Sequence, residues 1–122
     1  MKISIPITQN FRNKNNIAQF RIQKEQLKAQ LEQTKSDIHY QVEKTETDLD
    51  NARQNMQAAN KNYQLSQKIY NNQEKQFQVG AFQYSNLLET ERSLHRAEKN
   101  YIQKVYAYLN AKIAYEKAIG EL

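Results

Sequence analysis

Neither glycine nor proline occurs between Ile17 and Phe77, and this long gap limits the fold more than any other feature of the sequence. Ala, Gln, Lys, Glu and Leu dominate the stretch, and all five are strong helix formers. Chain reversals favour Gly or Pro, yet the 122 residues include only two glycines and one proline. A β-sandwich, a β-barrel closed by this chain alone and a βαβ enzyme fold are therefore excluded. We predict an all-α chain of long helices.

Side chains of two sizes recur every seven residues on both sides of Gly80. We call the first set the large series and the set that follows three residues later the small series. This repeat is typical of a long antiparallel coiled-coil helical hairpin, in which the two series form the helix-packing seam. The large series is Val42, Leu49, Met56, Tyr63, Tyr70 and Phe77, then Leu87, Leu94, Tyr101, Tyr108, Tyr115 and Leu122. The small series is Thr45, Ala52, Ala59, Ser66 and Gln73, then Thr90, Ala97, Lys104, Ala111 and Ala118.

Four segments are expected along the chain. Ile3, Ile5 and Ile7 alternate with other residues, which predicts a short N-terminal strand segment over residues 1–10 with Pro6 at an edge or bulge. A long helix is predicted over residues 11–78 and a hairpin tip over 79–83. A shorter return helix follows over 84–122, ended near Gly120 and capped at its start by Asn86 and Glu89.

The pairing of the two helices depends on where the chain reverses. A turn centred on Gly80 sets large residues against small ones, for example Tyr63 against Ala97, and fills the layers evenly. In that register Lys104 faces Met56 and has to extend its charged end to solvent. A centre a few residues later pairs large residues with large ones, and the sequence does not exclude it. We favour the turn at Gly80.

The predicted helices are unequal in length, so residues 17–40 have no partner within the chain. Apolar residues nevertheless continue there, and others lie off the seam of the second helix. We therefore predict that each helix has neighbouring helices on both sides, as in a closed or layered multi-helix assembly. We also expect the chain to self-associate. These residues are Phe20, Ile22, Leu27, Leu31 and Ile38, and then Leu88, Ile102, Val105, Leu109 and Ile113.

The charges indicate a solvated helical surface. The formal net charge is +5, but both signs are dispersed, and we see no concentration of Lys and Arg on one face; no nucleic-acid partner is predicted. The absence of cysteine excludes disulfides and thiol catalysis. No apolar run approaches the roughly 20 residues of a transmembrane helix. The first residues lack the features of a signal peptide, so we expect no targeting signal in this chain.

No catalytic, metal or cofactor site is predicted. His39 and His95 lie in different helices without a second ligand of metal-binding type nearby, and two helices offer no pocket for a nucleophile and its base. The aromatic residues at the tip, Phe77, Phe82 and Tyr84, allow two interpretations. They form a hydrophobic plug at the end of the hairpin, or an exposed apolar patch that docks a partner.

One further pattern identifies a family. A valine-glycine turn is followed by a leucine pair, by regularly spaced Leu, Ala and Tyr, and by an Ala-x-Gly ending, which resembles the C-terminal helix of the TolC-like outer membrane efflux family. The strand-like start, polar link and long helix resemble that family's last barrel strand entering its longest periplasmic helix. The residues concerned are Ile3–Ile7, Val79, Gly80, Leu87, Leu88, Leu94, Ala97, Tyr101, Tyr108, Leu109, Ala118 and Gly120.

The resemblance implies a trimeric α-helical barrel, of which this chain forms a segment. Members join an outer-membrane β-barrel, absent from this chain, to a periplasmic tunnel that meets a periplasmic adaptor and an inner-membrane pump of Gram-negative bacteria, for tripartite efflux or type I secretion. Val79, Gly80 and Ala81 map to the adaptor-docking turn. Phe77, Phe82 and Asn86 become the candidates for a pore constriction, without the charged gate of some drug-efflux members. We interpret the chain as a fragment of such a channel; the alternative is the coiled-coil hairpin of a periplasmic adaptor (membrane fusion) protein.

Overall fold

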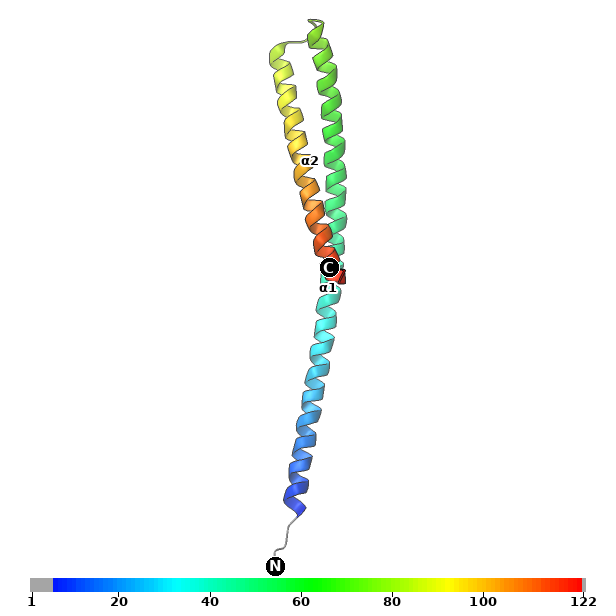
Figure 1. Cartoon of the computed structure of the whole chain (residues 1–122), viewed down its shortest axis with the longest axis vertical. Coiled ribbons are helices and arrows are strands. Elements are labelled where there is room, and N and C mark those ends of the chain that lie inside the picture. The colour runs from blue at the N-terminus through cyan, green and yellow to red at the C-terminus, as the bar shows by residue number, and fades with distance from the viewer. Residues whose placement is uncertain (1–5, 122) are drawn as a thin grey trace, which may run out of the picture. The chain divides into compact units, whose positions relative to one another are not determined.

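The computed structural model describes residues 6–121. Within them the chain forms two α-helices, α1 from Pro6 to Gln78 and α2 from Tyr84 to Ile119, joined by the turn of residues 79–83 (Figure 1). The all-α helical hairpin predicted from the seven-residue repeat is confirmed. By contacts the chain divides into two units, residues 1–40 and 41–122, which we describe separately.

The predicted strand is only partly covered by the structure. Residues 1–5 lie outside the described residues, so that part of the expectation stays a prediction. The rest of the predicted segment, from Pro6 to Asn10, belongs to α1, and the helix therefore begins before the predicted residue 11. Proline is well suited to the first helical position because its missing N–H has no intrahelical partner there. A single strand, by contrast, has nothing to pair with in this chain.

Unit 2 is the hairpin itself. α2 and the part of α1 from residue 41 onward lie side by side and run in opposite directions (Figure 1). Residues of the two series are the ones withdrawn from solvent: Ala59, Leu87 and Ala97 are only 5%, 8% and 5% exposed. Most other members of both series are half-buried. Few side chains are fully buried, because two helices that contact along one stripe protect only the residues of that stripe from solvent.

Two contacts show how the helices are paired, and they correct the preferred register. The rings of Tyr63 and Tyr101 stack with centroids 6.0 Å apart and planes 8° from parallel. The Thr90 hydroxyl hydrogen-bonds the side-chain oxygen of Gln73. Large residues thus face large ones, and small residues face small ones. The predicted pairing of Tyr63 with Ala97 is wrong.

The same register extends along the seam by steps of seven residues. Two heptads from the Tyr63–Tyr101 stack, Leu49 and Tyr115 line one shallow hollow, as this register requires. Thr45 and Ala118 share another hollow, four heptads from the Gln73–Thr90 contact. Lys104 then belongs to the layer of Ala59 rather than of Met56. A small partner leaves room for the aliphatic part of a lysine side chain, and its charged end still reaches solvent.

The cause of the shift is the conformation of Gly80. Its φ is +76°, in the left-handed region, and it ends α1 rather than forming the centre of the reversal. Its N–H donates to the carbonyl oxygen of Phe77 at 2.9 Å, and the N–H of Ala81 donates to that of Gln76 at 2.8 Å. This is a Schellman motif with glycine at C′. The chain needs residues beyond the glycine to turn, which moves the centre of the hairpin toward Phe82.

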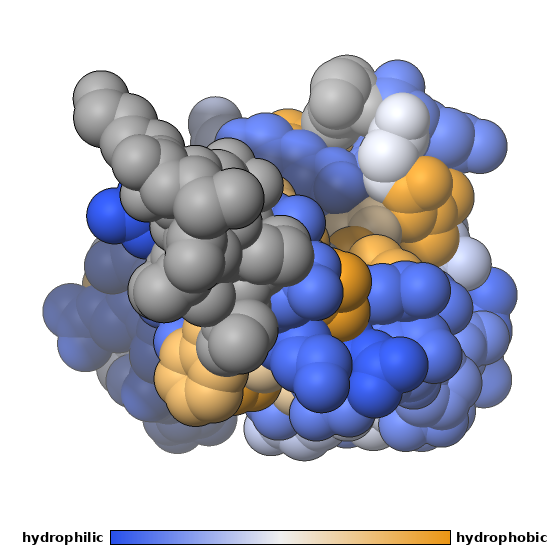
Figure 2. Space-filling model, turned by 90° about the horizontal axis from the view of Figure 1, so that it is seen from below, coloured by the Kyte–Doolittle hydropathy of each residue, from blue (hydrophilic) through white to orange (hydrophobic). Residues whose placement is uncertain are grey.

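Unit 1 is the helical stretch of α1 up to Tyr40. The Lys35 ammonium lies 3.7 Å from the Glu32 carboxylate, and the Gln33 amide donates to Asp37 at 3.0 Å. Both contacts are exposed and contribute little to stability. In Figure 2 hydrophobic patches stand apart on a largely hydrophilic surface. Several large apolar side chains of unit 1 are more than half exposed: Phe11, Ile17, Phe20, Ile22, Leu27, Leu31, Ile38 and Tyr40.

Cysteine cross-linking distinguishes the observed register from the one centred on Gly80. We expect Ser66→Cys with Ala97→Cys to oxidise rapidly, because these positions lie one heptad from the Gln73–Thr90 contact in both helices. Tyr63→Cys with Ala97→Cys, the pair of the other register, should oxidise more slowly. The chain has no cysteine of its own, so gel mobility of the oxidised protein reports each pair without background. The reverse order of rates would contradict the observed register.

Candidate functional site at the hairpin tip

The turn of residues 79–83 is built from backbone contacts. α1 ends with the Schellman motif at Gly80, and the N–H of Val79 donates to the carbonyl oxygen of Lys75 at 3.3 Å. Gln83 is the N-cap of α2, with extended backbone (φ −78°, ψ 141°) and no capping side-chain hydrogen bond. The predicted capping pair of Asn86 and Glu89 is therefore wrong, because both residues lie within the helix. The tip is held by the main chain and leaves its side chains available.

The apolar residues of the tip divide into two groups. Leu87 is buried, and the rings of Phe77 and Tyr84 meet at a centroid distance of 5.8 Å with planes 43° apart. This contact links the last turn of α1 to the first turn of α2. Val79, in contrast, is 79% exposed at the end of the hairpin. Features of both interpretations of the tip are thus present, an aromatic contact that closes the hairpin and an apolar side chain directed to solvent.

The three constriction candidates do not share one environment. Phe77 lies against Tyr84, whereas Phe82 and Asn86 line a shallow hollow with Ile69. Phe82 is half-buried and Asn86 is exposed. The hollow is also lined by Gln73 and Thr90, the polar seam residues nearest the tip. Its complete lining is Ile69, Gln73, Phe82, Asn86, Glu89, Thr90 and Ser93.

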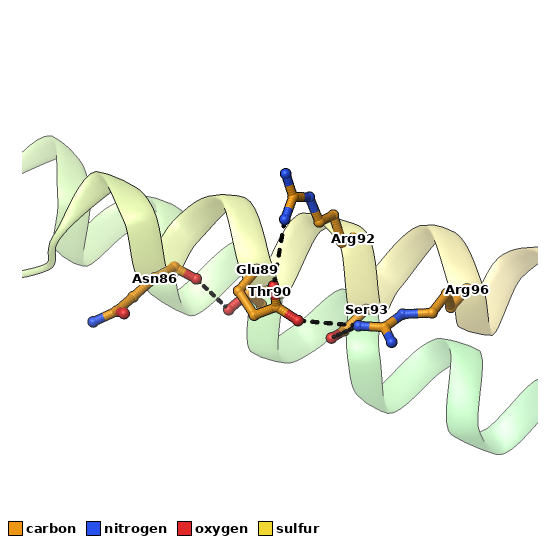
Figure 3. A network of polar contacts seen from close by, with 6 residues as sticks. All are labelled: Asn86, Glu89, Thr90, Arg92, Ser93 and Arg96. Carbon is orange, nitrogen blue, oxygen red and sulfur yellow. Dashed lines mark hydrogen bonds and ion pairs between the residues drawn. The ribbon is translucent and has the colours of Figure 1, made fainter.

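A polar network covers the first turns of α2 (Figure 3). The Glu89 carboxylate accepts a hydrogen bond from Arg96 Nη2 at 3.1 Å and lies 3.7 Å from Arg92 Nη1. Arg96 Nη2 also lies 3.4 Å from the Ser93 hydroxyl. One carboxylate thus holds two guanidinium groups on the exposed surface of α2, which limits their freedom near the tip. The pairs are solvent-exposed, and their contribution to stability is small.

Next to this network, on the side of α2 that faces α1, Thr90 joins the two helices. Its hydroxyl lies 3.0 Å from the carbonyl oxygen of Asn86 in α2 and contacts Gln73 in α1. One turn further from the tip, burial raises the pKa of the Tyr70 phenol, with smaller contributions from the negative charges of Glu74 and Glu91. The phenol therefore stays neutral and remains a hydrogen-bond donor at physiological pH.

His95 lies close to two carboxylates of its own helix, 3.9 Å from Glu91 and 3.5 Å from Glu98. Within residues 6–121, no three His, Asp or Glu side chains come together in a way that could hold a metal ion. In the same range, neither helix contains an apolar stretch long enough to cross a membrane.

Sequence reasoning located the tip but missed its polar contacts. The spacing of Glu89, Arg92 and Arg96 at three and seven residues gives a signal for such a network, since these positions lie on one helical face. The Thr90–Gln73 contact was not foreseen, because it depends on the register of the seam.

These features define a helical hairpin with a glycine-ended tip, and the family comparison agrees with them. The model of the outer membrane efflux protein family matches residues 1–121. The chain belongs to this family, and it is thus a component of an outer membrane efflux channel. Searches of curated proteins and of solved structures found no match.

Substituting Gly80 by alanine tests the backbone of the tip. An added Cβ would meet nothing within 4 Å, so the cost is that of the left-handed backbone alone, about 1–2 kcal/mol. We expect Gly80→Ala to lower the urea midpoint of the helical circular-dichroism signal, and Gly80→Asn to lower it less. Gln78→Ala, at a helical position, is the control and should leave it unchanged. Equal midpoints for Gly80→Ala and Gln78→Ala would contradict the role of the glycine.

Proposed function

We propose that this hairpin forms part of the periplasmic tunnel of an outer membrane efflux channel and that its tip docks a periplasmic adaptor. The observation that carries the docking role is Val79, an apolar side chain 79% exposed beside the glycine that ends α1. An adaptor surface that covers Val79, Gly80 and Ala81 gains the burial of that side chain, worth on the order of 1.5–3 kcal/mol. The open space around Gly80 lets a partner approach the backbone closely.

The proposed place in a multi-helix tunnel is supported by the apolar side chains that the hairpin leaves exposed. On α2, Ile102, Leu109 and Ile113 are nearly half exposed, and on α1 Leu65 is more so. Each helix therefore carries apolar surface besides the seam, as expected of a helix with neighbours on both sides. In this proposal further helices and subunits of a trimer cover these side chains, and the chain is one segment of a longer channel subunit.

The proposed path for substrate passes the tip. Phe82 and Asn86, which line the same hollow, are the residues we assign to a constriction, with Phe77 supporting the turn through its contact with Tyr84. The segment is then passive: it lines and restricts a pore and carries out no covalent chemistry. The adaptor is in turn the link to an inner-membrane pump. We place the hairpin in the periplasm and the rest of the channel in the outer membrane of a Gram-negative bacterium.

The alternative, the coiled-coil hairpin of the adaptor itself, accounts for the paired helices and for a glycine at the tip. It does not account for the family match, which extends over residues 1–121 and supports the channel.

Docking at the tip is tested by Val79→Asp in cells whose efflux depends on the channel that contains this chain. A carboxylate buried against an apolar adaptor surface costs more than the ~1.4 kcal/mol that corresponds to tenfold weaker binding. We expect survival in toxic efflux substrates to fall toward that of cells without the channel, while Val79→Leu retains activity. Immunoblots of the outer membrane establish that channel levels are equal.

Gln103→Asp provides the matched control, since it places the same charge on an exposed position of α2 away from the tip. Efflux should be unchanged in this variant. Wild-type efflux in Val79→Asp cells with a normal channel level would overturn the docking role.

A further inference from the structure

The position of the large series changes its chemistry between the two units. In unit 2 it holds apolar residues from Val42 to Phe77, and continuing the same spacing backward reaches four cations in unit 1. We call these four residues the basic stripe. On a helix, residues seven apart lie on nearly the same face, so the stripe follows one side of unit 1. The basic stripe is Lys14, Arg21, Lys28 and Lys35.

The structure of unit 1 shows these cations as exposed neighbours on one face. All four side chains are exposed, and Lys14 and Arg21 line one shallow hollow together with Ile17 and Glu25. Lys35 pairs with Glu32, whereas Lys14, Arg21 and Lys28 have no carboxylate in ion-pair contact among residues 6–121. The carboxylates Glu25 and Glu32 follow Arg21 and Lys28 by four residues, so both signs occur beside the stripe, and the alignment of the cations is visible only around the helix.

The residues three positions after the stripe argue against a purely solvated face. Ile17, Leu31 and Ile38 occupy the continuation of the small series, and each is more than half exposed. Lys24 is the polar exception. Apolar residues are usual at both seam positions of a coiled coil, and a cation at one of them specifies the partner at a cost in stability. Such a cation lays its aliphatic part over the partner helix and extends its charged end toward the edge, where a carboxylate can pair with it. A face that stays in water gains nothing from three exposed isoleucine or leucine side chains.

We propose that the basic stripe packs against an α-helix that carries apolar residues at its seam and Asp or Glu at seven-residue intervals. Successive cations of the stripe are about 10.5 Å apart along the helix, and a helix running alongside repeats its carboxylates at the same interval. Double-stranded nucleic acid presents about one charge per 1.7 Å of its axis and has no apolar groups at the stripe's interval to cover Ile17 and Leu31. This inference rests on the proposed tunnel, of which the acidic helix is a further segment.

Charge reversal in the complete channel tests the pairing. We expect Arg21→Glu with Lys28→Glu to lower the temperature at which the assembled channel dissociates on detergent gels, because carboxylates then face carboxylates. Neutralisation by Arg21→Gln with Lys28→Gln should produce a smaller decrease. Arg12→Glu with Lys61→Glu is the matched control, since both residues lie two positions before the large-series spacing, away from the seam. Equal dissociation temperatures for both reversed pairs would overturn the proposal.

A second measurement identifies the partner without disturbing the charges. A photo-cross-linking amino acid at Leu31, in the assembled channel in its membrane, should attach to a peptide with Asp or Glu at seven-residue intervals. An adduct with lipid, with nucleic acid or with a peptide that lacks these acids overturns the proposal, as does the absence of any adduct. The tip is tested separately: an acidic-helix adduct together with wild-type efflux in Val79→Asp would reject adaptor docking and leave the acidic partner standing.

Discussion

The stacking of Tyr63 on Tyr101 fixes the layer on which the rest of the hairpin depends. Because both helices keep a seven-residue repeat, one such layer sets every other layer of the seam. Large residues meet large ones, and the intervening layers of small residues permit close approach, as at buried Ala59 and Ala97. The hydrogen bond between Thr90 and Gln73 belongs to this register alone and opposes a slip by one turn. Polar pairs within a coiled-coil seam are well suited to that role.

The register also determines what the tip presents. Since α1 ends in a Schellman motif at Gly80, Val79 directly follows the helix and remains exposed, while Phe77 is in position to contact Tyr84 across the turn. The aromatic contact and the backbone hydrogen bonds hold the turn without using the side chain of Val79. A surface built in this way would lose little conformational freedom if a partner covered it, because its backbone is already fixed.

The sequence was sufficient to predict the two helices, their antiparallel arrangement and the tip, since these follow from the absence of Gly and Pro and from the seven-residue repeat. The prediction of the register failed because it assumed that each layer pairs a large residue with a small one, which sets Tyr63 against Ala97. The backbone conformation at the turn determined the register instead. A glycine at C′ is followed by the loop, so Gly80 pointed to a later centre. The start of α1 could not be derived, because Ile3–Ile7 alternates like a strand and only context decides between strand and helix.

The chemistry of the large series changes along the chain with the cover that the chain itself provides. Where α2 covers it, the position is apolar, as at Leu49 and Met56; where the chain offers no paired helix, it is basic, as at Arg21 and Lys28. Apolar residues there would be an exposed hydrophobic stripe during synthesis and assembly, and prone to association with any apolar surface. Cations at the same positions avoid such a stripe and, in the proposed pairing, favour a partner helix that has carboxylates at matching intervals. In the proposed pairing, these cations therefore contribute specificity to an assembly built from repeated coiled-coil seams.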